Sequence, residues 1–286
     1  MTFRTLNERD LRALRIFRVA AQAGGFSAAE RRLNMTKATI SRQIKDVEQR
    51  LGARLCTRGP RGFELTEAGA AALRQTEIAL DALDRILPEV DATRAVISGK
   101  LVLGITDNLI GNPGSTLHLA LDRLSQAAPA VEVELHTMTT NQLLRALAER
   151  RLDIAIKGVY ERDSALEYHP LFTECHRIYG VEAGGAGAPE HRPLVFRAVQ
   201  PFVESALQDL GFTRGPEAVG LESVALLIAS GHYIGILPTH YARLWHTQYA
   251  LRELPGTPTY EVEFCAVTNP ARPLSRAAEK LLGLLY

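Results

Sequence analysis

The chain has 286 residues, a length suited to two or three domains, and 46% of them are hydrophobic, which is enough to build cores. No run of eighteen apolar residues occurs, so we expect no transmembrane helix. The charged first ten residues also lack the apolar segment of a secretory signal. Three widely spaced cysteines predict neither a disulfide framework nor a zinc site. We therefore expect a cytoplasmic protein that uses no metal and no cofactor.

The net charge of +1 conceals an uneven distribution along the chain. Residues 1–62 contain fourteen Lys and Arg but only five Asp and Glu, a net charge of +9, and this leaves −8 for the rest. A basic segment joined to an acidic body is typical of a nucleic-acid-binding module attached to a domain with another task. The N-terminal quarter is therefore the candidate DNA-binding part.

Two short helices are predicted in this basic segment. Ser27 followed by Glu30 fits the capping-box pattern and predicts a helix over 27–33. Thr36 is a candidate N-cap for a second helix, and Gly52 is placed to end it. The apolar stripe of that second helix is formed by Ile40, Ile44, Val47 and Leu51. This spacing predicts a helix-turn-helix, whose second helix enters the major groove of DNA.

The face of the second helix opposite the stripe is basic and hydroxyl-rich. Long cations there can reach phosphates and guanine edges, and hydroxyls can reach phosphates or bases. The alternative is a solvated amphipathic helix, which the net charge of the whole segment disfavours. The residues expected at the DNA are Ser27, Thr36, Lys37, Ala38, Thr39, Ser41, Arg42 and Lys45.

Two short strands are predicted after Gly52, over 53–58 and 63–66, with a turn at 59–62 that is rich in Gly and Pro. Such a hairpin would form a wing beside the second helix. Arg58 and Arg61 would lie at its tip and contact a phosphate or the minor groove. The alternative role for both arginines is solubility alone.

Five motifs occur in order over about sixty residues. They are Phe17, Phe26-Ser-Ala-Ala-Glu-Arg-Arg-Leu33, Ser41-Arg-Gln-Ile-Lys-Asp-Val-Glu-Gln-Arg-Leu-Gly52, Leu55-Cys-Thr-Arg58 and Leu65-Thr-Glu-Ala-Gly69. Together they resemble the N-terminal domain of the LysR-type transcriptional regulators. The resemblance implies a winged helix-turn-helix that binds double-stranded promoter DNA, a small-molecule co-inducer, and dimers that pair into tetramers.

The chain departs from the family pattern at four positions. Lys37 stands where Gln is usual, and Ala38 where Pro or Ser is common. Val47 replaces Leu, and Cys56 replaces Phe. The change at Lys37 leaves the fold unaffected but bears on which operator sequence is recognised.

Residues 66–92 predict one long helix with an apolar stripe. A helix of about thirty residues cannot bury that stripe alone, so a second copy of the chain is the expected cover. The residues expected at this homodimer seam are Leu73, Leu80, Leu83 and Leu87, joined by Ile86. The alternative is packing of the first turns against the winged domain itself. We take 1–65 as the DNA-binding domain and 66–95 as a linker and dimerisation helix.

Residues 96–286 predict alternating strands and helices, which favours parallel strands with right-handed crossovers. Strands are expected at 101–105, 131–138, 152–156, 168–181, 194–196, 234–237 and 264–267, and helices at 114–127, 140–150, 201–210, 222–230, 239–246 and 274–285. We expect two α/β lobes: lobe I about 96–170 with 268–286, and lobe II about 171–267. Two such lobes resemble the effector domain of the same family, which is like periplasmic solute-binding proteins.

Ligands of open α/β sheets bind beyond the carboxyl ends of strands and at helix N-termini. Lys157 and Arg197 suit a carboxylate or phosphate, whereas Asp107 could accept a hydrogen bond from an amine, so the charge of the effector stays open. The hydroxyl-bearing residues could instead be helix caps only, and Lys157 a surface cation. The residues expected at the effector are Thr106, Asp107, Asn108, Thr139, Thr140, Lys157, Arg197, Glu222 and Ser223.

Proteins of other classes fit less well. No nucleophile elbow, zinc-protease motif, Walker loop or dinucleotide fingerprint occurs, and the eight histidines are dispersed, so we do not expect an enzyme. A transport solute-binding protein would not need the basic head, and an architectural DNA protein would not need the acidic body. The sequence therefore predicts a DNA-binding regulator controlled by a small molecule.

Cys175 and Cys265 lie on the two segments that are expected to cross between the lobes, so we expect them to approach each other. Some peroxide-sensing members of the family switch by disulfide formation, at cysteines placed differently. We prefer two structural cysteines without a redox role, because a sensor thiol needs exposure and a fixed cation beside it.

Overall fold

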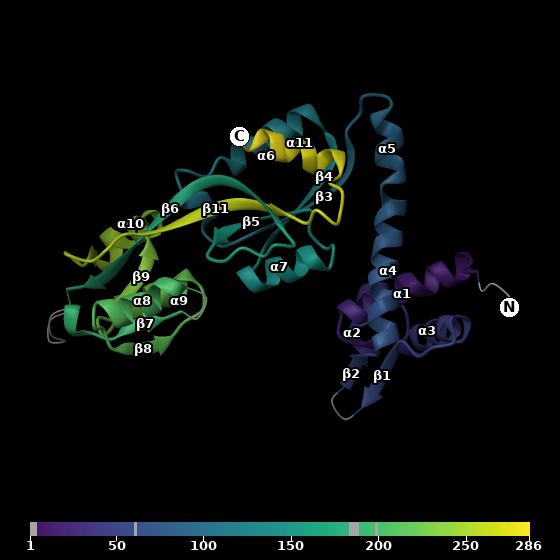
Figure 1. Cartoon of the computed structure of the whole chain (residues 1–286), viewed down its shortest axis with the longest axis horizontal. Coiled ribbons are helices and arrows are strands. Elements are labelled where there is room, and N and C mark those ends of the chain that lie inside the picture. The colour runs from purple at the N-terminus through teal and green to yellow at the C-terminus, as the bar shows by residue number, and fades with distance from the viewer. Residues whose placement is uncertain (1–4, 60–61, 183–188, 198–199) are drawn as a thin grey trace. The chain divides into compact units, whose positions relative to one another are not determined.

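The computed structural model describes residues 5–59, 62–182, 189–197 and 200–286. The chain divides into two compact units, Met1–Val90 and Asp91–Tyr286. The first is helical with a small hairpin, and the second is built around a curved sheet (Figure 1). Each unit has cores of its own.

The first unit is a winged helix-turn-helix followed by a long, nearly continuous helix. Its elements are α1 (Glu8–Gln22), α2 (Phe26–Leu33), α3 (Lys37–Leu51), β1 (Cys56–Gly59), β2 (Gly62–Leu65), α4 (Glu67–Asp84) and α5 (Ile86–Ala92). The core forms where α1, α2 and α3 meet, around the fully buried Phe17, Ile40 and Val47. The predicted apolar stripe of the second helix is thus confirmed.

Helix caps in this unit follow the sequence with one exception. Thr36 accepts a hydrogen bond from the Thr39 N–H, and Gly52 ends α3 with φ of 70°, as predicted. The prediction that Ser27 caps α2 is wrong, because the N-cap is Gly25 and Ser27 lies inside the first turn. Glu30 instead accepts a hydrogen bond from the Lys37 N–H at 2.5 Å, so it caps the next helix rather than its own.

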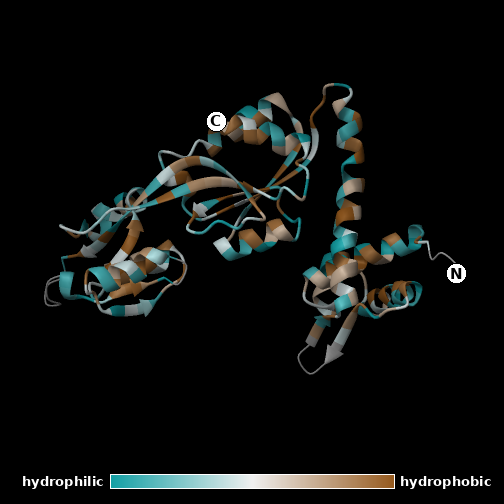
Figure 2. Ribbon diagram, in the orientation of Figure 1, coloured by the Kyte–Doolittle hydropathy of each residue, from teal (hydrophilic) through white to brown (hydrophobic). Residues whose placement is uncertain are grey.

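The long helix predicted over 66–92 is interrupted at Arg85. Pro88 explains the interruption, because it has no N–H to donate and its ring crowds the carbonyl of Asp84, four residues earlier. The helical path continues past this point, since the Glu89 N–H donates to the Arg85 carbonyl at 3.0 Å. Figure 2 shows hydrophobic bands along the whole of α4 and α5.

The second unit has two lobes. The elements of lobe I are β3 (Ser98–Ile105), the short 3-10 helix η1 (Leu109–Gly111), α6 (Leu117–Ala127), β4 (Ala130–Thr137), α7 (Thr140–Ala148), β5 (Ile154–Val159) and α11 (Arg276–Leu284). Those of lobe II are η2 (Pro189–His191), β7 (Leu194–Phe196), α8 (Pro201–Asp209), β8 (Arg214–Glu217), α9 (Leu221–Ala229), β9 (Gly235–Pro238), α10 (Thr239–Tyr249) and β10 (Leu251–Glu253). The strands β6 (Glu167–Val181) and β11 (Tyr260–Thr268) run through both lobes (Figure 1).

One sheet joins the two lobes, with the order β10-β6-β11-β5-β3-β4, and β9 also pairs with β6. β3 is parallel to β4 and to β5, as the alternation of strands and helices predicts, whereas β11 is antiparallel to its neighbours. Strands β8 and β10 were not predicted, because one contains Gly and Pro and the other has three residues. In lobe I, α6 and α11 cover one face of the sheet and α7 covers the other.

The prediction that Cys175 and Cys265 approach each other is wrong. They lie on neighbouring strands, but Cys175 pairs with Glu261 and Cys265 with Pro170. Four residues along a strand span about 13 Å, whereas a disulfide requires Cα atoms within about 7 Å. Burial, together with the neighbouring Glu263, also raises the pKa of Cys265 to about 11, which disfavours the reactive thiolate.

The start of α4 packs directly on the backbone that precedes the wing. Thr66 caps α4 and its hydroxyl donates to the Arg54 carbonyl at 2.6 Å. Gly69 is buried one turn later, and a Cβ added there would lie 1.8 Å from the Leu55 carbonyl oxygen. The glycine of the Leu65–Gly69 motif is therefore required by this close approach.

We expect Gly69→Ala to lower the free energy of unfolding of the N-terminal unit by about 1–3 kcal/mol, because the helix must move away from the wing. Urea unfolding followed by circular dichroism measures the loss. Fluorescence of Trp245, the single tryptophan, reports the other unit and should not change. Gly283→Ala is the control, because no atom lies within 4 Å of its added Cβ and alanine favours a helix there by about 0.5–1 kcal/mol. Equal behaviour of the two variants would contradict the close-packing argument.

Candidate DNA interface and effector cavity

The polar face of α3 is open to solvent. Lys37, Arg42 and Lys45 are exposed, and Ser41 is half-buried, on the side of α3 opposite its buried stripe. The outward direction of these side chains satisfies the geometry that reading a major groove requires. The Thr36 hydroxyl forms the helix cap and also contacts the Thr39 hydroxyl at 2.9 Å.

The wing is an antiparallel pair of strands. Arg58 of β1 pairs with Phe63 of β2, and the Phe63 ring packs against Phe26 of α2 at 5.5 Å between ring centroids. This aromatic contact holds the hairpin beside the helix-turn-helix. Arg61, predicted at the tip, lies outside the described residues.

A cavity of about 500 Å³ opens between the two lobes of the second unit. Lobe I contributes the end of β3 and the N-terminus of α7, and lobe II contributes the segments that precede α8 and α9. Glu174 and His176 of β6 and Phe264 of β11 also line it. The crossing strands thus form part of its wall.

The structure brings five of the nine predicted effector residues to this cavity: Thr106, Asp107, Thr139, Thr140 and Arg197. Asn108, Lys157, Glu222 and Ser223 do not line it. Thr139 also caps α7 in a capping box with Gln142, so its alternative role as a cap is present as well. Asp107 Oδ2 lies 3.4 Å from the Leu221 N–H at the start of α9, a weak hydrogen bond from lobe I to lobe II.

Lys157 is absent from the cavity because β5 is longer than predicted. The strand runs to Val159, so residue 157 lies within it instead of following it. Lys157 pairs with Cys265, which packs against α7, and cross-strand partners share a face of the sheet. Its side chain is 2% exposed, and burial lowers its pKa.

Several buried polar atoms of the cavity have no hydrogen-bond partner within the described part of the chain. They are Thr106 Oγ1, both ring nitrogens of His176, Arg197 Nε and both amide atoms of Gln200. Gln200 is only 1% exposed and His176 only 2%. Buried polar groups are normally paired, so this cluster is a marked exception.

Three polar side chains surround the carboxylate of Glu174. The Asn112 side-chain amide donates to it at 2.9 Å, His176 Nε2 lies 2.8 Å away, and His240 Nδ1 lies 3.6 Å away. Burial lowers the pKa of His240 in spite of the nearby Glu174 carboxylate, which favours the neutral ring. The network joins β6 to residues of both lobes.

Burial lowers the pKa of the Arg197 guanidinium, and the charges of Tyr160, Asp107 and Glu174 oppose that shift. No ion pair of Arg197 occurs among the residues that the structure describes. Tyr160 lies nearby with a pKa raised by burial, and its contact with Gln200 is loose, because neither amide atom of Gln200 meets hydrogen-bond geometry.

Lining residues that were not predicted include Tyr160, Glu174, His176 and Gln200. Tyr160 directly follows the true end of β5, so the rule that selected Lys157 would have found it with the correct boundary. Gln200 stands before Pro201, which starts α8, and an X-Pro step at a helix start was an available signal. Glu174 and His176 sit inside a long strand and carry no sequence signal of a site.

Comparison with known proteins identifies the family of both units. A family model described as a bacterial regulatory helix-turn-helix protein of the lysR family matches residues 11–70, and one described as a LysR substrate binding domain matches residues 94–286. The chain belongs to the LysR family. It is therefore a DNA-binding transcriptional regulator with an effector-binding domain, and not an enzyme, as the sequence predicts.

Relatives of this LysR-family chain match over nearly its whole length. The transcriptional activator BauR of Pseudomonas aeruginosa is 32% identical over 284 residues, which cover 96% of this chain and 93% of that protein. The SDS degradation transcriptional activation protein of a Pseudomonas strain is 30% identical, over 96% of this chain and 95% of its own length.

Solved structures of the family share the fold. A full-length OxyR variant from Pseudomonas aeruginosa matches with a TM-score of 0.65 at 20% identity, over 96% of this chain and 94% of that one. CbnR in complex with its target DNA matches with a TM-score of 0.63 at 20% identity, over 96% and 98%. The predicted fold class, a winged helix-turn-helix, a long helix and a two-lobed α/β domain, is confirmed.

Within the described ranges, no helix combines the length and apolar character needed to cross a membrane. In the same residues, His, Cys, Asp and Glu do not gather in threes that could hold a metal ion.

We expect Lys157→Met to raise the free energy of unfolding by about 1–3 kcal/mol at pH 7, because a buried amine is replaced by an apolar chain of similar length. Burial lowers the pKa of Lys157 in the folded chain. Between that lowered pKa and the unfolded value of 10.5 the unfolded chain binds more protons, so wild-type stability rises with pH in that window. The variant should lose this rise.

Urea unfolding at pH 7 and pH 9, followed by Trp245 fluorescence, measures both effects. Lys280→Met on α11 is the control, because that lysine is only half-buried and is expected to be solvated. A Lys157→Met protein less stable than the wild type would show that the amine makes a stabilising contact.

Proposed function

We propose that this regulator responds to a small carboxylate held by Arg197 in the cavity between the lobes. The observation that carries the proposal is the Arg197 guanidinium, which is largely buried, lines the cavity and lacks an ion-pair partner among the described residues. A buried unpaired charge is costly, so a ligand that supplies the counter-charge is favoured.

The acidic groups nearby act on Arg197 without forming an ion pair with it among the described residues. Glu174 lies beside Asn112, His176 and His240, and Asp107 faces the N–H of Leu221. A guanidinium presents parallel N–H groups that match the two oxygens of a carboxylate. The unpaired amide of Gln200 and hydroxyl of Thr106 are placed to bind further polar atoms of the same ligand.

The size and lining of the cavity fit a small organic molecule. Ligand sites commonly measure about 300–1,000 Å³ and are largely apolar with a few polar groups. Met138, Leu221 and Phe264 supply apolar wall beside the polar cluster. A carboxylate with a short carbon skeleton is therefore the class of effector that we favour.

For DNA, we propose that the exposed face of α3 reads the operator. Lys37, Ser41 and Arg42 lie on that face, and cations and hydroxyls of this kind contact phosphates and base edges. Arg58, whose side chain lies outside the described part of the chain, is kept from the sequence as the proposed contact of the wing. Since promoter DNA is the partner, we place the protein in the cytoplasm with the chromosome.

We also propose a homodimer through the exposed part of the long helix, and a tetramer by the family resemblance. The seam differs from the one expected from sequence. Leu73 packs against the core of its own winged domain and Leu80 is 1% exposed, so neither is free to face a partner. The large hydrophobic residues that are exposed on this helix are Ile78, Leu83, Ile86, Leu87 and Val90, between 39% and 74% accessible.

We expect Arg197→Gln to abolish effector binding while leaving the fold intact. A panel of small carboxylates, each with its amide analogue, is screened by thermal unfolding of the full chain, since a ligand at about 100 times its Kd adds about 2.7 kcal/mol. A carboxylate should raise the Tm of the wild type and its amide should not. Arg197→Gln should weaken the binding free energy of the carboxylate by at least about 2 kcal/mol.

Arg243→Gln is the matched control, because Arg243 is exposed on α10 and does not line the cavity. It should keep the full thermal shift. Carboxylates that bind Arg197→Gln as tightly as the wild type would refute the proposed role of Arg197.

We expect Leu83→Glu with Leu87→Glu to dissociate the dimer, because burying unpaired carboxylates in an apolar seam is costly. Light scattering across a concentration series measures the mass. Arg74→Glu is the control, since Arg74 is exposed and nine residues before Leu83, on the opposite side of the helix. An unchanged mass of the double variant would place the seam elsewhere.

A further inference from the structure

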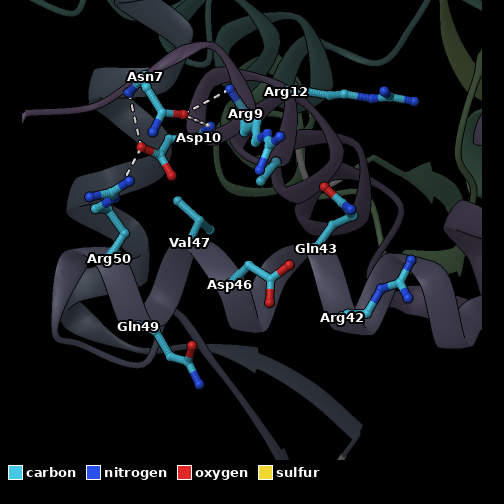
Figure 3. A pocket seen from close by; sticks show the side chains of 11 residues that line it. Asn7, Arg9, Asp10, Arg12, Arg42, Gln43, Asp46, Val47, Gln49 and Arg50 are labelled. Atoms are coloured by element: carbon cyan, nitrogen blue, oxygen red, sulfur yellow. Dashed lines mark hydrogen bonds and ion pairs between the residues drawn. The ribbon is translucent and has the colours of Figure 1, made fainter.

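A groove of about 860 Å³ lies between the start of α1 and the recognition face of α3, within the first unit. Arg9 and Arg12 come from α1, and Arg42, Gln43 and Asp46 come from α3 (Figure 3). Neither arginine of α1 was singled out in the sequence. The groove continues directly from the exposed face of α3, because Arg42 belongs to both.

Two of the charges in the groove neutralise each other. Asp10 accepts a hydrogen bond from the Asn7 N–H at 2.9 Å, and Arg50 Nε lies 3.3 Å from the same carboxylate (Figure 3). This pair ties the first turn of α1 to the last turn of α3. It therefore has a structural role and is not available to a ligand.

The remaining charges of the groove are predominantly positive. Arg9, Arg12 and Arg42 are exposed, and none of them forms an ion pair within the ranges that the structure describes. Asp46 is the remaining carboxylate in the lining. The groove thus carries a net charge of +2 next to the helix that reads DNA.

We propose that this groove holds the sugar-phosphate backbone of the bound DNA, with Arg9 and Arg12 as phosphate contacts. The proposal rests on the α3 interface proposed above. A helix that enters the major groove, about 12 Å wide, has a phosphate backbone on either side of it. On one side of α3 lies the wing, and on the other side lies this groove.

The chemistry of the lining supports a phosphate over other occupants. Guanidinium groups bind phosphate oxygens through two parallel N–H donors. Gln43 can donate to the same oxygens. The Asp46 carboxylate repels phosphate, so the backbone is expected to run along the α1 wall, over Arg9 and Arg12.

The position of α1 makes these contacts useful for orientation. Leu14 and Phe17 of α1 are buried in the core against α3, so α1 is held in place relative to the recognition helix. Arginines on its exposed side would therefore fix how deeply and at what angle α3 enters the groove. Contacts of this kind position a protein on DNA without reading its sequence.

The test is the salt dependence of DNA binding by the full chain carrying Arg9→Ala and Arg12→Ala. Fluorescence anisotropy measures affinity between 50 and 200 mM NaCl for two duplexes, the DNA upstream of the chain's own gene and a scrambled duplex of equal length. Each lost phosphate contact removes about 0.9 from the slope of log K against log salt, so the slope should fall by about 1.8.

Both duplexes should lose affinity by the same factor, about tenfold or more at 100 mM salt, because phosphate contacts carry no sequence information. Arg42→Ala should instead reduce the ratio between the two duplexes. Arg9→Lys with Arg12→Lys should restore most of the slope, because the positive charges remain.

Arg74→Ala is the matched control, since it removes an exposed cation of α4 that is not in the groove. An unchanged slope in the double alanine variant, an equal decrease in Arg74→Ala, or failure of the lysine variant to restore the slope would each overturn the proposal. Loss of sequence preference without a change of slope would also overturn it, by making these arginines base contacts. A wild type that binds neither duplex would refute the α3 interface together with the groove.

Discussion

The antiparallel pairing of β6 with β11 is the interaction on which the effector domain depends. Both strands run through the two lobes, so the lobes are connected by a ladder of backbone hydrogen bonds and not by flexible linkers. The ladder has an irregularity between Phe264 and Cys265, at the level where Phe264 meets the cavity. The cavity therefore lies where the ladder departs from regular register, a common place for a bulge beside a site.

The same pairing explains why the polar cluster is where it is. Residues of β6 alternate between the two faces of the sheet, so Glu174 and His176, two positions apart, project to the same side. Asn112 from lobe I and His240 from lobe II then meet Glu174 from opposite directions. A change in the angle between the lobes would have to stretch these contacts, which links the cavity wall to the relative position of the lobes.

Much of the fold could be predicted from local sequence, but only some residues of the two sites could. Thr36 and Gly52 could be predicted because capping depends on neighbours within one turn. Lys157 was misplaced because the predicted strand ended three residues too early, at 156, whereas β5 runs to Val159 and residue 157 lies inside the sheet. His176 could not be found, because its significance arises from long-range strand pairing, whereas Gln200 carried only the local signal of the proline that follows it.

For the carboxylate effector that we propose, the unpaired atoms in the cavity also govern how ligands are told apart. A pocket whose buried donors are already satisfied gains little from one ligand over another of equal shape. Here a molecule that lacks the complementary group leaves polar atoms of Arg197 and Gln200 buried without hydrogen bonds. The cost of those unpaired atoms weakens the binding free energy of that molecule. Selectivity in this cavity therefore comes mainly from weak binding of similar molecules that lack the complementary group. Neutral analogues of the same shape should bind far more weakly than the small difference in size suggests.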